Sequence, residues 1–314
     1  MSAEKKQKDN RIKSKSRILA MGLKVIIFFL SVLITIAVFA LVRGQMIVVR
    51  TYASSSRTPG KVKIAALTDL HGKVRGKKQG RIVSKIKDQD PDIIVYLGDM
   101  VERTKVNESK ESLRMLTEQL IQIAPVYYVD GNHEQDVHDD DPEVYKSIND
   151  ELADIGAVQL DNSIIRLPIG EEGTILNLCG ISTHYYWNDT ENELIADLKE
   201  SDGIKVILCH YPETVLWQEV FKEGGCDLAL CGHTHGGLVR VPCRGGLISP
   251  EWGWWPPYDL GEYPVYTDTS YSHYGGEPGS AYLGTMIISG GLAGEHGIPR
   301  INNPMEISIV EIEK

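Results

Sequence analysis

The chain has 314 residues, enough for one large domain or two small ones, and a formal net charge of −10. Eight Lys and Arg residues but only two acidic ones lie in the first 24 positions, so the remaining residues carry a net charge of −16. Because nucleic-acid affinity depends on Lys and Arg neutralising phosphates, we do not expect a domain this acidic to bind nucleic acid. The five cysteines show no paired metal spacing, and their disulfide state is left open.

The N-terminal region predicts a membrane anchor behind a basic tail. Residues 1–24 form a tail that we expect to be disordered and cytoplasmic, and residues 25–42 form an uncharged apolar run. At ~1.5 Å rise per residue, such a run nearly crosses a ~30 Å hydrocarbon core. The basic leading flank predicts a single-pass cell-membrane protein with its folded domain on the extracytoplasmic side. A cleaved signal peptide ending at Ala40 is the alternative, but signal-peptide apolar regions are usually shorter.

The remainder predicts an α/β fold. Residues 43–60 form a juxtamembrane strand (46–52) and linker, and residues 61–314 form the folded domain. Buried-strand runs then alternate with helical patterns, which is typical of an α/β core. The strands are expected at 62–68, 92–97, 125–129, 204–209 and 226–231. The helices are expected at 78–89, 110–123, 142–155, 190–200 and 212–223.

A second set of strand-like segments predicts a second sheet packed on the first. These segments are 157–167, 174–181, 236–241, 280–289 and 305–312. The stretch 242–279 is rich in Gly, Pro and aromatic residues and lacks periodicity, so we expect a long loop there. Loops of this length inside a compact domain are usually functional or mobile.

Five short motifs rich in metal-binding residue types follow predicted strands in a fixed order. They are Asp69-Leu70-His71, Gly98-Asp99, Gly131-Asn132-His133-Glu134, His210 and Gly232-His233-Thr234-His235. Each motif alone is common at strand ends and turns. Together they hold five of the nine histidines, and this joint pattern indicates a two-metal phosphoesterase site.

The residue types suit divalent transition metals. A turn after the first strand can aim both Asp69 and His71 at one ion, and a carboxylate with neutral imidazole suits Mn, Fe, Zn or Ni without choosing among them. The Asp99 carboxylate can bridge two cations, as two-metal sites require. Asn132 offers a neutral oxygen ligand.

These motifs resemble those of the calcineurin-like metallophosphoesterases, whose D-x-H, G-D, G-N-H-[ED], H and G-H-x-H blocks match over roughly residues 60–312. The GHTHGG run at 232–237 and the closing GLAGEHGIPRINNPMEI are more narrowly similar to the membrane-anchored bacterial phosphodiesterases. The resemblance implies a four-layer αββα sandwich, in which two mixed sheets are flanked by helices. The metals would lie at the C-terminal ends of the strands.

The resemblance also implies a dinuclear centre of two divalent metal ions, taken as Mn, Fe or Zn. One ion would be held by Asp69, His71, Asp99 and His235, and the second by Asp99, Asn132, His210 and His233. A hydroxide bridging the ions would attack phosphorus in line. His133 would stabilise the charge or protonate the departing oxygen, and Glu134 would orient His133.

Other residues bear on the substrate. Arg103 falls where protein phosphatases of this superfamily place a phosphate-binding arginine, and the alternative is a solvated surface arginine. His184 and His296 follow strand-like runs and are candidates for substrate contact. The aromatic cluster at 252–258 either pins the long loop or enters the lipid headgroup layer, because Trp and Tyr favour membrane interfaces.

The sequence therefore predicts a metal-dependent phosphoric ester hydrolase, more narrowly a phosphodiesterase, at the outer face of the membrane. Its phosphoester substrate would be lipid-linked or part of the cell envelope. A phosphomonoesterase or protein phosphatase is the alternative that an inward-pointing Arg103 would favour. A non-catalytic metal-binding scaffold is a third reading, disfavoured because no expected ligand is missing.

Overall fold

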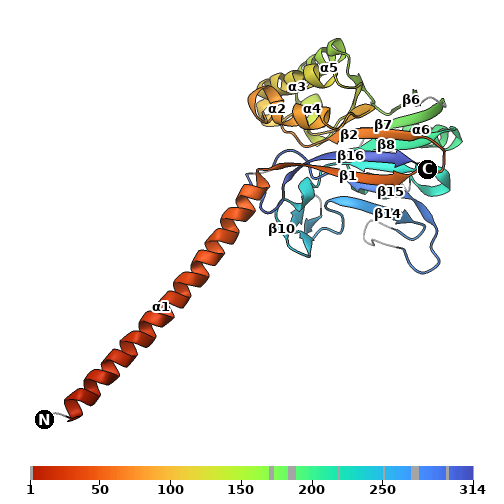
Figure 1. Cartoon of the computed structure of the whole chain (residues 1–314). Helices are drawn as coiled ribbons and strands as arrows, with labels where there is room; N and C mark the ends of the chain where they lie inside the picture. Colours follow the sequence, from red (N-terminus) through yellow and green to blue (C-terminus); the bar gives the residue numbers. More distant parts are fainter. Residues whose placement is uncertain are drawn as a thin grey trace.

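Two six-stranded mixed sheets pack face to face, and helices cover the outer face of each (Figure 1). The computed structural model describes residues 3–169, 173–182, 189–217, 220–249, 252–269, 276–294 and 297–313. The architecture is the four-layer sandwich that the resemblance implied. A long helix, α1 (Ala3–Gly44), leaves the domain at one end (Figure 1).

The first sheet has the strand order β1-β16-β2-β3-β4-β5. Its strands are β1 (Ile47–Ser55), β16 (Met305–Glu313), β2 (Lys61–Leu67), β3 (Ile93–Leu97), β4 (Val126–Val129) and β5 (Val158–Gln159). The strands from β2 to β5 run parallel, and β16 runs antiparallel to β2. Parallel strands covered on both faces need continuous apolar sequences, and β3 and β4 are buried throughout.

The second sheet has the strand order β14-β15-β9-β8-β7-β6. Its strands are β14 (Gly261–Tyr266), β15 (Tyr282–Ile288), β9 (Leu228–Cys231), β8 (Ile204–Cys209), β7 (Thr174–Ile181) and β6 (Ser163–Ile169). The four central strands run parallel, and the two edge strands run antiparallel to their neighbours. The C-terminal ends of β8 and β9 therefore point the same way.

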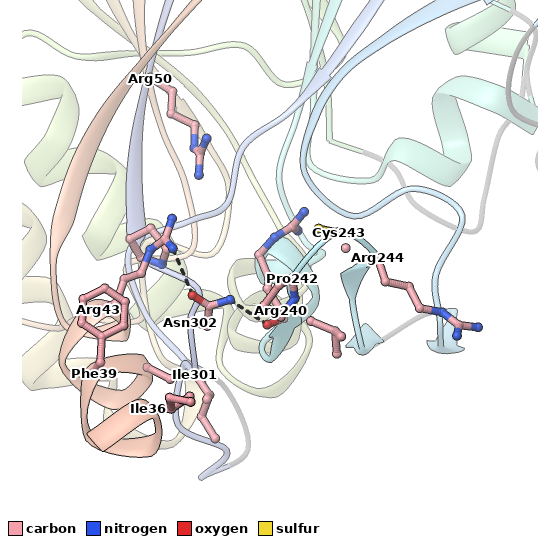
Figure 2. A pocket seen from close by; sticks show the side chains of 14 residues that line it. Ile36, Phe39, Arg43, Arg50, Arg240, Pro242, Cys243, Arg244, Ile301 and Asn302 are labelled. Atoms are coloured by element: carbon pink, nitrogen blue, oxygen red, sulfur yellow. Dashed lines mark hydrogen bonds between the residues drawn. The ribbon is translucent and has the colours of Figure 1, made fainter. Parts of the chain in front are cut away.

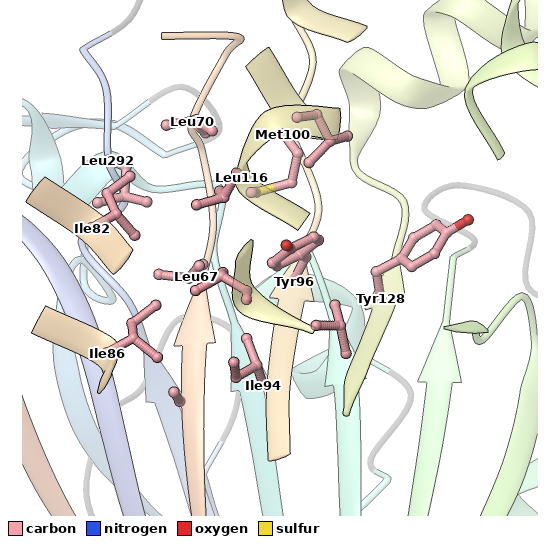
Figure 3. Packing of buried hydrophobic residues seen from close by; sticks show 14 of the residues in the cluster. Leu67, Leu70, Ile82, Ile86, Ile94, Tyr96, Met100, Leu116, Tyr128 and Leu292 are labelled. Atoms are coloured by element: carbon pink, nitrogen blue, oxygen red, sulfur yellow. The ribbon is translucent and has the colours of Figure 1, made fainter. Parts of the chain in front are cut away.

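Alternating residues of β2 pack into different hydrophobic cores, one between the two sheets and one between the first sheet and its helices. Ile64 and Ala66 of β2 face the other sheet, whereas Ala65 and Leu67 face the helices, as the two-residue period of a strand dictates. Figure 3 shows Leu67 packed near residues of the covering helices. The helices on this side are α2 (Gly80–Lys87), α3 (Val106–Leu120), α4 (Asn132–Asp140) and α5 (Pro142–Ile155). On the other side lie α6 (Asp189–Glu200) and α7 (Pro212–Trp217).

The expected division of strands between the sheets is wrong in several places. The last strand, β16, lies inside the first sheet, whereas β8 and β9 belong to the second. The segment 157–167 splits into β5 and β6, which lie in different sheets. The reason is physical: both sheets are covered on both faces, so an apolar run shows that a strand is buried but not which sheet holds it.

The stretch 242–279 contains more regular structure than expected. The edge strand β14 lies within it, as do three short strands, β11 (Gly245–Gly246), β12 (Ile248–Ser249) and β13 (Gly253–Trp254). The segment 236–241 holds only the two-residue strand β10 (Arg240–Val241), which pairs with β11 outside both large sheets. All five cysteines lie in the described part of the chain, and none forms a disulfide.

The N-terminal helix runs without a break from Ala3 to Gly44, so the basic tail expected to be disordered is helical. Its segment Leu19–Gly44 is long and apolar enough to cross a membrane. The side chains of this segment are almost all exposed, because the helix packs on the domain only at its C-terminal end.

Candidate metal centre

The five motifs meet where parallel strands of the two sheets end. Asp69, Asp99 and Asn132 follow β2, β3 and β4 of the first sheet. His210 and His233 follow β8 and β9 of the second. Ligand sites in open α/β sheets form at the carboxyl ends of the strands, and here two such edges lie together.

Three groups of side chains in the described part of the chain place their ligand atoms within 4.8 Å of one another. The first group is Asp69, His71 and His235. The second is Asp99, His210 and His233. These two groups bring together six of the seven residues in the two ligand sets that the resemblance implied, and their assignment to metal ions stays a prediction. The third group, His71, Glu102 and His133, contains a carboxylate that the sequence reasoning missed.

The Asp99 carboxylate lies between the groups. Its Oδ2 atom is 3.4 Å from Nε2 of His210 and 3.9 Å from Nε2 of His71. The same oxygen is 4.0 Å from Nε2 of His133. Within the first group, Nε2 of His235 is 3.6 Å from Oδ1 of Asp69. One carboxylate oxygen thus faces imidazoles from all three groups.

Several buried polar atoms of the centre have no hydrogen-bond partner among the described residues. Both carboxylate oxygens of Asp69, both ring nitrogens of His71 and Oδ1 of Asn132 are in this state. Burying a carboxylate without compensation is costly, so these atoms fit a cation that would coordinate them. Burial lowers the pKa of His71 to about 4, which keeps its imidazole neutral and able to bind a metal at neutral pH.

Electrostatics keep Asp99 ionised. Burial alone would raise the pKa of Asp99, but the neighbouring His210, His71 and His133 together hold it well below its usual range. The converse holds for His210, where burial would lower the pKa and the Asp99 charge raises it. The Asp99 carboxylate is therefore ionised at neutral pH, beside a His210 ring whose protonation it favours.

Backbone carbonyls orient two of the histidines. Nδ1 of His210 lies 2.7 Å from the carbonyl oxygen of Leu97, and Nδ1 of His235 lies 3.2 Å from that of Ala293. A carbonyl can only accept, so each Nδ1 carries a proton, and in the neutral ring each Nε2 is left as a lone-pair donor facing the carboxylates. Arg300 holds the Ala293 carbonyl from its other side, with Nη1 at 2.7 Å.

The turns that carry these side chains adopt unusual backbone conformations. The φ angles of Asp69, Asp99 and His235 are +52°, +53° and +51°, and His71 and His233 also have positive φ. Such conformations are uncommon for residues other than glycine and cluster at functional sites. Position 98 requires glycine, because a Cβ there would lie 2.6 Å from the Gly131 nitrogen.

Glu134 has a different task from the expected one. Its carboxylate accepts hydrogen bonds from the backbone N–H groups of Asp99, Val101 and Gly131, at 2.8, 2.9 and 2.9 Å. These hydrogen bonds connect the turn after β3 to the start of α4. The carboxylate near His133 belongs to Glu102, with Oε1 3.5 Å from Nδ1. The helix α4 was not predicted, although a Glu three residues after a Gly N-cap is a helix-start signal.

The substrate candidates have different outcomes. The Arg103 guanidinium forms an ion pair with Asp136, and its side chain is 48% exposed, as the surface alternative predicted. His184 and His296 lie outside the described residues. The aromatic cluster divides: Tyr258 is buried beside Trp252, whereas Trp254 is 68% and Trp255 41% exposed.

The three hydrogen bonds that Glu134 accepts predict a large effect of its removal on stability. Replacing Glu134 with Ala leaves three buried N–H groups without their acceptor, at about 1–3 kcal/mol for each unsatisfied group. We expect Glu134→Ala to lower the free energy of unfolding by about 3 kcal/mol or more, measured by urea unfolding of the full chain in mild detergent. Gln135→Ala, at the exposed neighbouring position, is the control and should change stability by less than about 0.5 kcal/mol. Equal stability of the two variants would contradict this stabilising role of the Glu134 carboxylate.

Comparison with known proteins agrees with this geometry. The family described as Calcineurin-like phosphoesterase matches residues 62–237. The chain is 23% identical to the uncharacterized protein YpbG of Bacillus subtilis (strain 168), over 76% of this chain and 82% of YpbG. It is 29% identical to the phosphodiesterase YaeI of Escherichia coli (strain K12), over 52% of this chain and 56% of YaeI.

A vertebrate protein is also similar. The match is to a transmembrane protein with metallophosphoesterase domain from Danio rerio, at 28% identity over 60% of this chain and 44% of that protein. The chain thus spans about half the length of YaeI and of the Danio protein. The family match covers more than half of the chain and contains all five motifs. The chain belongs to the calcineurin-like phosphoesterase family.

Proposed function

We propose that the protein is a phosphodiesterase that depends on two divalent metal ions. One ion would be held by Asp69, His71, Asp99 and His235, and the other by Asp99, Asn132, His210 and His233. The observation that carries the proposal is the position of Asp99 Oδ2, which faces His71 of one group and His210 of the other. The buried oxygens of Asp69 and Asn132, which have no hydrogen-bond partner among the described residues, support it.

The chemistry of the bound ions would be that of other two-metal hydrolases: they lower the pKa of a water molecule and neutralise charge on the phosphoryl oxygens. The protein residues have separate tasks. Asp69 and Asp99 supply buried negative charge that attracts and positions the cations. The carbonyls behind His210 and His235 keep both rings in the ligating tautomer.

His133 is suited to act on the departing oxygen. The backbone N–H of Arg103 donates to its Nδ1 at 3.4 Å, so the ring proton lies on Nε2. Nε2 is the atom that faces the centre, 4.0 Å from Asp99 Oδ2. It can therefore donate to a phosphoryl or leaving-group oxygen. Glu102, 3.5 Å from Nδ1, would stabilise the ring when it is charged.

A phosphodiester is favoured over a phosphomonoester by two observations. The Arg103 guanidinium is engaged by Asp136 at the surface, so the argument for a monoester-binding arginine is lost. The relative YaeI is named a phosphodiesterase. We extend the proposal to a lipid-linked or cell-envelope phosphodiester because the chain has an apolar helix and the exposed indoles of Trp254 and Trp255.

The full chain in detergent, loaded with Mn²⁺, Fe²⁺ or Zn²⁺, is expected to hold two ions and to hydrolyse bis-p-nitrophenyl phosphate. Asp99→Ala or His235→Ala should lower kcat/KM by about 10²–10³-fold or more, because transition-state charge loses its stabilisation. Metal content is measured by inorganic mass spectrometry and folding by circular dichroism. His138→Ala, at an exposed histidine, is the control and should keep full activity. Two bound ions without turnover of any phosphoester would favour the non-catalytic scaffold instead.

The proposed topology places residues 1–24 in the cytoplasm, residues 25–42 in the membrane and residues 61–314 outside, following the basic flank that precedes the apolar run of α1. Protease added to intact cells that express the full chain should remove the domain and leave the N-terminal tail protected. The readout is immunoblotting with tags at both ends, and lysed cells serve as the control. Protection of the domain in intact cells together with loss of the tail would reverse the orientation.

A further inference from the structure

A cavity of about 710 Å³ lies where α1 meets the domain. One wall is the apolar end of α1, including Ile36 and Phe39. Four arginines from distant parts of the sequence also line it, namely Arg43, Arg50, Arg240 and Arg244. No acidic side chain is among the described residues that line this cavity. We propose that the cavity binds the phosphate headgroup of an anionic phospholipid, whose acyl chains lie against α1.

The two walls are held together by specific contacts. The backbone N–H of Asn302 donates to the carbonyl oxygen of Ala40 at 2.8 Å. Nη1 of Arg43 donates to Oδ1 of Asn302 at 3.1 Å, and Figure 2 shows Arg43 and Arg240 on either side of this asparagine. A Cβ at Gly44 would overlap the carbonyl of Arg300, so only glycine permits this approach. The cavity is therefore part of a built junction between helix and domain.

The arginines are not all neutralised. Nε of Arg50 pairs with Glu306 at 2.7 Å, and Nη1 of Arg240 pairs with Asp259 at 3.1 Å. Across the described residues, neither Arg43 nor Arg244 forms an ion pair; the first bonds an amide, and the second lies 4.1 Å over the Trp255 ring. Two uncompensated guanidinium groups thus remain in a domain that is strongly acidic as a whole. The planar guanidinium matches phosphate oxygens in two-pronged hydrogen bonds.

The apolar wall beside the arginines favours an amphiphilic ligand over a soluble anion. Ile36 and Phe39 are 58% and 63% exposed and belong to the segment long enough to cross a membrane. Figure 2 shows Phe39 beside Arg43, so the apolar wall and the charge are adjacent. The exposed indole of Trp254 lies on β13, which follows the cavity-lining segment along the chain, and Trp favours the headgroup level. Anionic headgroups are attracted to arginines at the end of a membrane helix.

The cavity and the metal centre share one segment of chain. Strand β10, which lines the cavity, follows the turn that carries His235, and Nη1 of Arg240 donates to the Gly236 carbonyl at 2.8 Å. A bound lipid would therefore fix the turn and the height of the centre above the membrane together. The inference concerns binding alone, so it stands whether or not the protein is a phosphodiesterase.

The test uses the full chain in a neutral detergent, stripped of metal with EDTA and titrated with short-chain phosphatidylglycerol or phosphatidylcholine of equal chain length. Native mass spectrometry gives the Kd for each lipid. The wild-type protein should bind phosphatidylglycerol about tenfold more tightly. The double variant Arg43→Gln/Arg244→Gln should lose this preference, whereas Arg43→Lys/Arg244→Lys should keep most of it because the charge is retained. The control Arg114→Gln/Arg166→Gln removes two arginines elsewhere on the domain, one half-buried and one exposed, and should leave the preference unchanged.

Three results would overturn the proposal. The first is equal binding of both lipids by the wild-type protein, and the second is equal loss of preference in the cavity and control variants, which would indicate diffuse attraction. The third is displacement of phosphatidylglycerol by glycerol 3-phosphate at equal concentration, since a ligand without acyl chains would then suffice. Circular dichroism of each variant checks that the fold is retained.

Discussion

The buried negative charge of Asp99 is the constraint on which the rest of the domain depends. Its carboxylate is almost completely inaccessible to water, and its Oδ2 atom faces rings from all three groups of the centre. Asp69 and Glu134 place two more acidic groups close by, and both are buried. Such a concentration of acid inside a protein is costly unless positive charge lies close by, and two divalent ions at the proposed sites would supply it. Divalent ions bound at the proposed centre would therefore stabilise the folded domain.

The backbone reflects the same constraint. Five candidate ligands adopt left-handed φ angles, each at a cost of the order of 1–3 kcal/mol. That cost is large beside the 5–15 kcal/mol by which typical domains are stable. Packing of the two sheets offsets this cost, because the turns follow strands that are packed on both faces. Glu134 also connects two of the turns through hydrogen bonds. Cations that bind only the folded state would add stability where the chain is most strained.

The sequence predicted the composition of the centre better than its surroundings. Strand ends carry their side chains to a common edge, so Asp69, Asp99 and His210 could be brought together from periodicity alone. Glu102 was missed because it lies in a turn with no periodic signal, and the role of Glu134 was missed because its partners are backbone groups. Assignment of strands to sheets failed because burial on both faces looks the same in either sheet. The arginine cavity was invisible because the pairing of β1 with β16 brings Arg50 and Asn302 to one end of the domain.

The central claim is that Asp99 joins two metal sites. Diffraction from crystals of the Mn²⁺-loaded protein, recorded at the manganese absorption edge, locates the ions without assuming their ligands. We expect two anomalous peaks about 3.5–4 Å apart. One should lie beside Asp69, His71 and His235, the other beside His210 and His233, with Asp99 coordinating both. A single peak, or two peaks of which only one touches Asp99, would contradict the account.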